Sequence, residues 1–502
     1  MKVVLISPYS DVTAYGLRSL SSYLKLMGHT VRMIFLPDHR EEVDDFRESI
    51  YEYPAELMAS VAAHCEGSDL IGISLMTYCF ERVAQLTDYL RNCLNIPIVW
   101  GGIHPTVRPD ECLQHAHFVC RGEGEQSLAK LAETLEAGSP TTAIPGLSYK
   151  QSGKVLHNPL PRLVQNLDLF PLPDYEIEDD FYAPLGLLPL KPMDQASFAS
   201  LMTLNPLANH LRGETVYQTM ASRGCPYHCA YCCNNFLRQL YKGQNYVRFL
   251  SVKRLISELV VAKTRFPFCN MVVFSDDSFF SAPRSWLEDF ARVYRQEIGL
   301  PFRCLASPLA ISEEKLSTLI GAGLKGVQVG IQSGSERTCR LYQRQASASK
   351  VIKAGKILAR FVPPLEPPKY DIILDNPFEE TKDIQDTLRL LMQIAPPYKV
   401  QQFSLVFLPG TDLYALAERE GFIEDERRQS YRKQFHLAQN IYLKLLLSLT
   451  GTRFPLPLLR ILTHPKVLDW FNRPTILPVL IVLRRWKVKL LMHYRRPAEL
   501  RD

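Results

Sequence analysis

Three closely spaced cysteines constrain this chain more than any other feature. Cys225, Cys229 and Cys232 form a C-x3-C-x2-C pattern, and no fourth cysteine follows at a corresponding spacing. Three thiolates this close can bind three irons of a [4Fe–4S] cluster. The fourth iron would stay open to a small molecule, which indicates chemistry rather than electron storage alone.

Two other uses of these cysteines are weaker. A zinc site needs four ligands, usually as two pairs roughly a dozen or more residues apart, and no second pair follows even if His228 or Cys233 contributes. A disulfide framework is weaker still, because the 12 cysteines are spread over 502 residues. With no signal peptide at the start, we expect a reducing, cytoplasmic location and mostly small buried cysteines elsewhere.

The cysteine loop resembles that of the radical S-adenosylmethionine superfamily. In that family the open iron is chelated by the amino and carboxylate groups of the methionine moiety. An aromatic residue commonly precedes the last cysteine, and Tyr231 has that position here. The resemblance implies that Cys225, Cys229 and Cys232 ligate the cluster, and that Tyr231 lies beside S-adenosylmethionine.

Composition predicts an ordinary globular enzyme of two or three domains. The apolar fraction is 46% and the charged fraction 22%. The net charge of +6 is modest, and it gives no reason to expect nucleic acid as a partner. The apolar run 476–483 contains Pro478 and is too short to cross a bilayer.

The first third of the chain alternates short apolar runs with helical patterns. This alternation predicts a doubly wound parallel sheet, whose ligands lie over the carboxyl ends of the strands. Small residues stand at several of these ends, among them Ser74, Gly101, Gly102 and Gly122. The expected strands are 2–6, 31–36, 70–75, 98–100 and 118–120.

Residues 1–140 resemble the cobalamin-binding domain that precedes many radical S-adenosylmethionine cores. Ser74-Leu75 and Gly101-Gly102 are similar to its Ser-x-Leu and Gly-Gly elements. The resemblance implies a cobalamin site that includes Ser74, Gly101, Gly102, His104 and Gly122.

One family element is missing, and the domain has a second interpretation. The loop 7–16 lacks the Asp-x-His-x-x-Gly element, so we expect no axial histidine from it. In the alternative, the glycines serve ordinary turns, His104 is a loop residue, and the domain binds no cofactor.

Residues 141–215 are rich in proline and predict a linker with a short hairpin near 147–155. From residue 216 the strand–helix alternation resumes. Six units are too few for a closed eight-stranded barrel, and they resemble the open (β/α)6 partial barrel of the radical S-adenosylmethionine family, with its active site at the strand ends. The expected strands are 216–220, 271–274, 302–306, 327–331, 370–374 and 400–408.

Two segments at these strand ends carry the predicted cofactor contacts. Residues 330–336 resemble the family's Gly-x-Gln/Glu-Ser-Gly-x-Glu segment, which implies that Gln332, Ser333 and Glu336 bind S-adenosylmethionine. Residues 275–279 resemble an Asp-Asp-x-Phe element and add Asp276. As alternatives, Ser333 or Glu336 caps the following helix and Asp276 is structural.

The last 78 residues, 425–502, predict helices interrupted by prolines. A basic, aromatic-bearing stretch, 475–492, permits two interpretations. It forms part of a helical lid over the barrel mouth, or it contacts an anionic membrane surface. Membrane contact would favour a lipid-like substrate.

Together these patterns predict an α/β enzyme with four segments. They are a cobalamin-binding-like domain (1–140), a linker (141–215), a radical S-adenosylmethionine core (216–424) and a helical extension (425–502). The family resemblance implies that the cluster cleaves S-adenosylmethionine, that the resulting radical abstracts hydrogen from an unactivated carbon, and that cobalamin supports methyl transfer to it.

Other outcomes stay open at this stage. Cobalamin could assist a cyclisation or oxidation without methyl transfer, or its domain could be vestigial. A non-enzymatic iron–sulfur or zinc scaffold is a further alternative. We expect a small-molecule or lipid-like substrate, an electron donor of the flavodoxin or ferredoxin type, and no nucleic acid.

Overall fold

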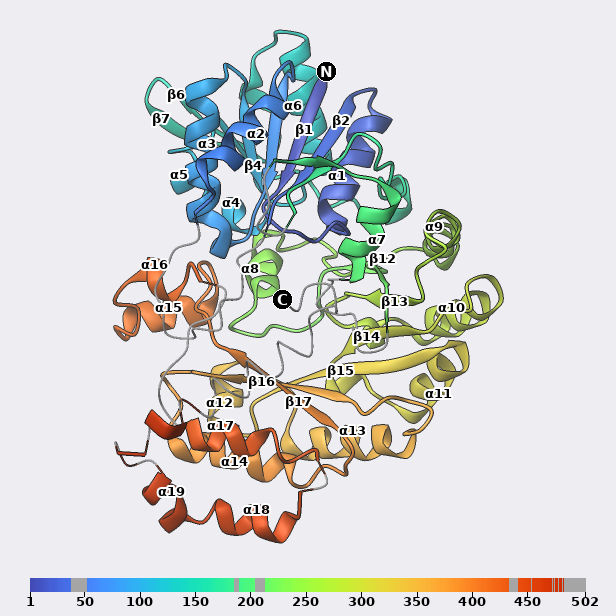
Figure 1. The fold of residues 1–502 in the computed structure, drawn as a ribbon, viewed down its shortest axis with the longest axis vertical. Helices are drawn as coiled ribbons and strands as arrows, with labels where there is room; N and C mark the ends of the chain where they lie inside the picture. The colour runs from blue at the N-terminus through green and yellow to red at the C-terminus, as the bar shows by residue number, and fades with distance from the viewer. Residues whose placement is uncertain are drawn as a thin grey trace.

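The computed structural model forms two α/β domains with a helical extension (Figure 1). This confirms the predicted architecture. The first domain is built on a nine-stranded sheet and the second on a six-stranded open barrel. The structure describes residues 1–37, 52–184, 189–203, 213–432, 441–452, 454–471, 473, 475–476, 478–480 and 482.

The centre of the N-terminal sheet is parallel, as the apolar runs predict. Its strands are β1 (Lys2–Ser7), β2 (Thr30–Phe35), β3 (Leu70–Ser74), β4 (Ile98–Gly101) and β5 (Phe118–Cys120), with the spatial order β5-β4-β3-β1-β2. Helices α1 (Tyr15–Leu26) and α6 (Glu125–Glu136) cover one face. Helices α2 (Ala55–Cys65) and α3 (Phe80–Cys93) cover the other.

Strand β1 shows why both faces are buried. Val3 and Leu5 belong to the core on the side of α1 and α6, whereas Val4 and Ile6 belong to the core on the side of α2 and α3. Because successive side chains of a strand alternate between faces, a run of apolar residues suits a sheet that is covered on both sides.

The segment predicted as a linker contributes strands to both edges of this sheet. The hairpin of β6 (Leu147–Gln151) and β7 (Lys154–His157) pairs antiparallel with β5. At the other edge, β8 (Phe181–Tyr182) pairs with β2, and β9 (Lys191–Pro192) follows it. Helix α7 (Gln195–Thr203) then leads to the second domain. The expected hairpin is therefore present, and the sheet is mixed at its edges.

The second domain has six parallel strands in chain order. They are β10 (Val216–Thr219), β13 (Met271–Phe274), β14 (Phe302–Ala306), β15 (Leu324–Gln332), β16 (Lys369–Leu374) and β17 (Lys399–Ser404). The outer helices are α9 (Val252–Arg265), α10 (Arg284–Glu297), α11 (Glu313–Ala322), α13 (Ala348–Arg360) and α14 (Thr381–Leu391). The sheet is not closed, because β10 and β17 pair with only one neighbour each.

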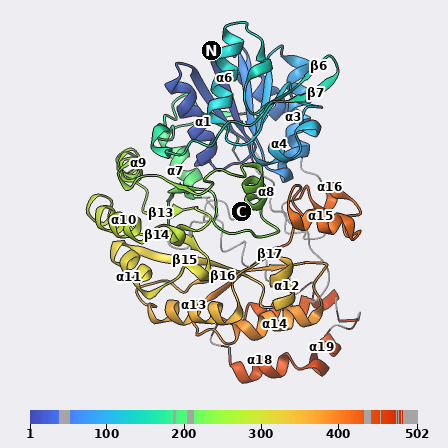
Figure 2. The same ribbon diagram turned by 180° about the vertical axis from the view of Figure 1, so that it is seen from behind.

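Shorter elements lie between the two domains and at the strand ends. Figures 1 and 2 both show α8 (Cys233–Leu240) between the N-terminal sheet and the barrel. The other elements are β11 (Ser222–Arg223), β12 (Arg248–Phe249), α12 (Glu336–Leu341), α4 (Ile103–Val107), α5 (Pro109–Cys112), α15 (Asp412–Arg419) and α16 (Glu426–Gln429).

Three helices of the extension, within residues 441–471, lie away from the N-terminal domain. Helix α17 (Ile441–Leu447) packs on α14, and α18 (Leu456–Leu462) and α19 (Pro465–Phe471) pack beyond it, on the side away from the N-terminal domain. The apolar faces of these helices join the outer core of the barrel. The lid prediction concerns the stretch 475–492 and stays a prediction. Most of the basic stretch 475–492 falls outside the described residues. Within them, no helix is long and apolar enough to span a bilayer.

Candidate active site

The two domains meet through the glycine-bearing edge of the N-terminal sheet. Gly122, just after β5, has φ of +80°, and a Cβ there would overlap the hydroxyl of Tyr241 at the end of α8. The same hydroxyl accepts a hydrogen bond from the backbone N–H of Glu123 at 3.1 Å. Glycine therefore lets the cysteine-bearing segment approach the sheet closely.

Buried ion pairs join the same surfaces. Arg223, in β11, contacts Glu125 at 2.5 Å and Glu123 at 3.2 Å. Arg248, in the partner strand β12, also pairs with Glu123. Burial alone would oppose the charge of Arg223, but the two carboxylates raise its pKa overall. The short strands on either side of the cysteine motif, β11 before it and β12 after it, are thus both held to the N-terminal domain by ion pairs.

The three motif cysteines lie in one loop between β11 and α8. Cys225 and Cys229 are buried and Cys232 is partly exposed. Burial raises the pKa of the Cys225 thiol to about 12, whereas the adjacent Cys233 thiol is the main cause that lowers the pKa of Cys232 to about 7. Within the described part of the chain, no three His, Cys, Asp or Glu side chains converge closely enough for a single metal ion.

A cation from the barrel reaches this loop. Arg344, after α12, donates from Nη1 to the sulfur of Cys229 at 3.3 Å and from Nη2 to the carbonyl oxygen of Gly330. Beside it, the ring of Tyr231 packs edge-on against Tyr342 with centroids 5.0 Å apart. The cysteine loop is therefore held against the end of β15.

The two aspartates after β13 have different roles. Asp276 is fully buried and accepts from the backbone N–H of Ala221 at 3.0 Å and from the hydroxyl of Ser222. Burial raises its pKa to about 6. Asp276 thus fixes the strand that precedes the motif, as in the structural alternative. Its neighbour Asp277 accepts from Asn234 at 2.9 Å and lies near the motif cysteines.

At the end of β15, two of the three predicted residues are buried or half-buried. Gln332 has φ of +74°, and its buried Oε1 has no hydrogen-bond partner among the described residues. The hydroxyl of Ser333 is buried between Thr387 and Glu379. Glu336 instead points to solvent and pairs with Arg340, while the hydroxyl of Ser335 caps α12.

Glu379, which the sequence analysis did not predict, also contacts the end of β15. It follows β16, and its carboxylate accepts from Ser333 at 3.3 Å. Burial raises its pKa to about 7. The sequence signal was weak, because Glu379 is followed by the similar Glu380, which caps α14.

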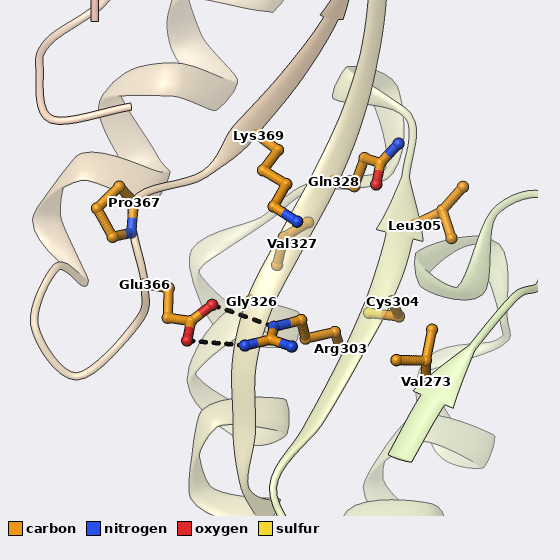
Figure 3. Close-up of a pocket in the computed structure, with 10 residues that line it drawn as sticks. All are labelled: Val273, Arg303, Cys304, Leu305, Gly326, Val327, Gln328, Glu366, Pro367 and Lys369. Carbon is orange, nitrogen blue, oxygen red and sulfur yellow. Dashed lines mark hydrogen bonds and ion pairs between the residues drawn. The ribbon is translucent and has the colours of Figure 1, made fainter. Parts of the chain in front are cut away.

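The inner face of the barrel is polar near its centre. Gln328 donates to both carboxylate oxygens of Asp371, at 3.1 and 2.9 Å, and burial raises the pKa of Asp371 to about 7. A small cavity of about 30 Å³ lies below this pair. Figure 3 shows its lining, with Gln328 and Lys369 above the paired Arg303 and Glu366. Arg303 also pairs with Glu214, so carboxylates balance its charge at the amino end of the barrel.

The N-terminal edge carries the remaining predicted residues. A Cβ on Gly102 would lie 2.7 Å from the carbonyl oxygen of Leu75, so backbone packing requires glycine there. Gly101 differs, because a Cβ on it would come no closer than 3.8 Å to another residue. Packing therefore does not require glycine at that point. Ser74 is half-buried beside Gly102.

His104 does not lie at this open edge. It is fully buried, with Nδ1 3.3 Å from the hydroxyl of Thr77 and Nε2 3.5 Å from the carboxylate of Glu111. Its ring packs against Phe80 and Tyr431. This geometry matches the alternative in which His104 is a packed loop residue, and it leaves no ring face for a cofactor.

Comparison with known families assigns both domains. The B12 binding domain matches residues 1–132, and the Radical SAM superfamily matches residues 220–391. The chain belongs to the radical S-adenosylmethionine enzymes that carry a cobalamin-binding domain. Radical S-adenosylmethionine enzymes of this kind use a [4Fe–4S] cluster, S-adenosylmethionine and cobalamin, act on small molecules and need a reductant.

Two curated proteins are similar in sequence. An uncharacterized methyltransferase of Pyrococcus horikoshii, PH0819, is 26% identical over 70% of this chain and 69% of its own length. The anaerobic magnesium-protoporphyrin IX monomethyl ester cyclase of Synechocystis sp. is 23% identical over 91% of this chain and 85% of its own length.

Two solved structures share the fold. The radical S-adenosylmethionine methyltransferase TsrM from Kitasatospora setae, with cobalamin and a [4Fe–4S] cluster bound, is 14% identical, with a TM-score of 0.63 over 83% of this chain and 78% of that one. The cobalamin-dependent radical enzyme OxsB is 16% identical, with a TM-score of 0.63 over 98% of this chain and 72% of that one.

Proposed function

We propose that this enzyme methylates an unactivated carbon of a small molecule bound between its two domains. In this proposal Cys225, Cys229 and Cys232 ligate the [4Fe–4S] cluster. When bound, the cluster supplies the electron that cleaves S-adenosylmethionine, and cobalamin carries the methyl group. The donor set fits the cluster, because three thiols lie in one loop near a fixed cation.

The observation that carries this proposal is the junction at Gly122. It packs the strand-end edge of the B12 binding domain against α8, which directly follows the cysteine loop. A group seated over that edge and a cluster in that loop would therefore share one space. Radical methylation needs such proximity, because the methyl donor must reach the same carbon that loses hydrogen.

The chain's own residues have three tasks at this junction. Gln332 offers a buried, unpaired amide oxygen that fits an N–H or O–H donor of S-adenosylmethionine. Ser333 and Tyr231 line the same strand end and loop and would position it. Ser74, Gly101 and Gly102 are small residues at the opposite edge, and they would let a flat corrin ring approach the backbone there. Glu336 and His104 are omitted from this site, because one is exposed and the other is enclosed.

A second candidate is a cyclisation or oxidation without methyl transfer. The match to the cyclase spans 91% of this chain, against 70% for the methyltransferase. Two structural neighbours that bind cobalamin share the architecture, and one of them is a methyltransferase. We favour methyl transfer on that basis.

The remaining parts of the proposal concern partners and location. We infer a flavodoxin- or ferredoxin-type donor, because cleavage of S-adenosylmethionine consumes one electron per event. The charge gives no support to nucleic acid as a partner. The basic segment 475–492 supports contact with an anionic surface and, with it, a lipid-like substrate. A binding assay with anionic vesicles tests that part separately.

Label transfer separates the two candidate functions. The reconstituted enzyme would be incubated anaerobically with reductant, cobalamin, methyl-deuterated S-adenosylmethionine and a metabolite extract. Methyl transfer predicts 5′-deoxyadenosine, cobalamin-dependent S-adenosylhomocysteine and a product heavier by one labelled methyl group. A cyclase predicts 5′-deoxyadenosine and an unlabelled product, without S-adenosylhomocysteine. Absence of 5′-deoxyadenosine under several reductants would rule out both.

A further inference from the structure

Arg344 forms a charged hydrogen bond with the motif cysteine Cys229, and this contact bears on electron transfer to the cluster. Arg344 donates to the sulfur of Cys229 at 3.3 Å, a contact between residues 115 positions apart in the chain. Its other terminal nitrogen donates to the carbonyl oxygen of Gly330, near the end of β15. The guanidinium is therefore fixed at two points, one on the barrel and one on the cysteine loop.

The guanidinium of Arg344 carries a positive charge, because an arginine side chain is not deprotonated in proteins even when it is buried. Among the described residues no carboxylate forms an ion pair with Arg344, in contrast to Arg223 and Arg303, which each contact two carboxylates. Its positive charge is thus directed at the thiol rather than neutralised by an acid.

We infer that Arg344 is a positioning residue that raises the reduction potential of the [4Fe–4S] cluster through its N–H···S hydrogen bond to Cys229. This rests on the proposed function, in which Cys229 ligates the cluster. Reduction adds one electron from the external donor and makes the cluster more negative by one charge. A nearby cation and a donated hydrogen bond stabilise that added charge, so the reduced state becomes easier to reach.

The rival explanation is that Arg344 serves only to bind the carboxylate of S-adenosylmethionine. Its buried Nε has no partner among the described residues and could accept that role. The two explanations differ when S-adenosylmethionine is absent. A hydrogen bond to Cys229 affects the potential without the substrate, whereas a carboxylate contact affects only binding.

The experiment compares Arg344→Met, Arg344→Lys and Arg340→Met with the wild-type enzyme. Arg340 lies on α12, four residues before Arg344, and is exposed and paired with Glu336, so it is a matched control for loss of one cation. Iron and sulfide are first measured per chain. The midpoint potential is then measured by an EPR-monitored redox titration without S-adenosylmethionine, and the affinity for S-adenosylmethionine is measured in parallel.

We expect a lower midpoint potential in Arg344→Met, an intermediate value in Arg344→Lys, and no change in Arg340→Met. A fully loaded Arg344→Met cluster with the wild-type midpoint would overturn the inference, and weaker binding of S-adenosylmethionine alone would assign the rival role. If Arg344→Met assembles no cluster, Arg344→Lys decides, because a wild-type midpoint in that variant contradicts the inference. A wild-type protein that binds no iron would instead refute the proposed function.

Discussion

Arg223 and Glu125 form a 2.5 Å ion pair that joins the strand before the cysteine motif to the first turn of α6. Both side chains are largely buried, and Glu123 also contacts Arg223. The pair therefore couples the position of the cysteine loop to the B12 binding domain. The following predictions test this junction and the site that it supports.

Removal of the Glu125 charge should destabilise the junction. In Glu125→Gln, Arg223 keeps its contact with Glu123 but loses its closer partner. We therefore expect the free energy of unfolding to fall by about 2 kcal/mol. Thermal unfolding of the wild type and the variant measures this. Glu288→Gln is the control, because its ion pair with Arg284 is exposed, and it should melt like the wild type. Equal midpoints in all three proteins would show that the buried pair does not hold the domains.

Gly122→Ala should lower the free energy of unfolding more than a glycine substitution at a site with similar backbone strain. Gly138 also has positive φ, +60°, but a Cβ there meets no atom within 4 Å. We expect Gly138→Ala to lose about 1 kcal/mol from backbone strain. Gly122→Ala should lose clearly more, because it also overlaps Tyr241. The double variant Gly122→Ala with Tyr241→Phe should recover part of the difference. Matching losses in the two single variants would contradict the close approach.

The three motif cysteines should be required for iron, and their neighbour should not. Cys225→Ser, Cys229→Ser and Cys232→Ser each remove one proposed ligand, so we expect iron to fall from about four per chain to less than one. Cys233→Ser is the matched control, since Cys233 directly follows the motif. Iron and sulfide analysis after anaerobic reconstitution measures the outcome. Full loading of any motif variant, or loss only in Cys233→Ser, would reassign the ligands.

Asp371 should make stability depend on pH. Burial raises its pKa to about 7 in the folded state, above the ordinary value near 3.8. The protonated form is favoured in the folded state, so this stabilisation is full below about pH 4 and is lost as pH rises through 7. Asp371→Asn resembles the protonated form and should therefore melt higher than the wild type at pH 8, with a smaller difference at pH 5. A difference that is independent of pH would contradict the raised pKa.

Much of the fold follows from sequence patterns alone. The expected strand 302–306 matches the bounds of β14, and four of its five residues are apolar. The edge strands β8 and β9 were not predicted, since two-residue strands leave no periodic pattern. The amphipathic helices of the extension were predicted, but not their place on α14. An apolar helix face indicates that a helix packs, not which surface it meets.

Side-chain direction at the strand ends was the harder part of the site. Asp276 and Asp277 are adjacent, and only the structure separates the buried acceptor from the one beside Asn234. Glu336 resembles a family position, yet Ser335 takes the helix cap and leaves Glu336 in solvent. Where a regular strand gives way to a turn, its two-residue alternation ends, and the sequence no longer fixes which side chain faces inward.

The central claim is that S-adenosylmethionine coordinates the free iron of the cluster directly. Electron–nuclear double resonance measures this coordination. The reduced, reconstituted enzyme would be studied with S-adenosylmethionine labelled with 15N at the amino group and 17O at the carboxylate. The account predicts hyperfine coupling of both labels to a cluster with about four irons per chain, because three cysteines leave one iron free. A fully loaded cluster that shows no coupling to either label would contradict it.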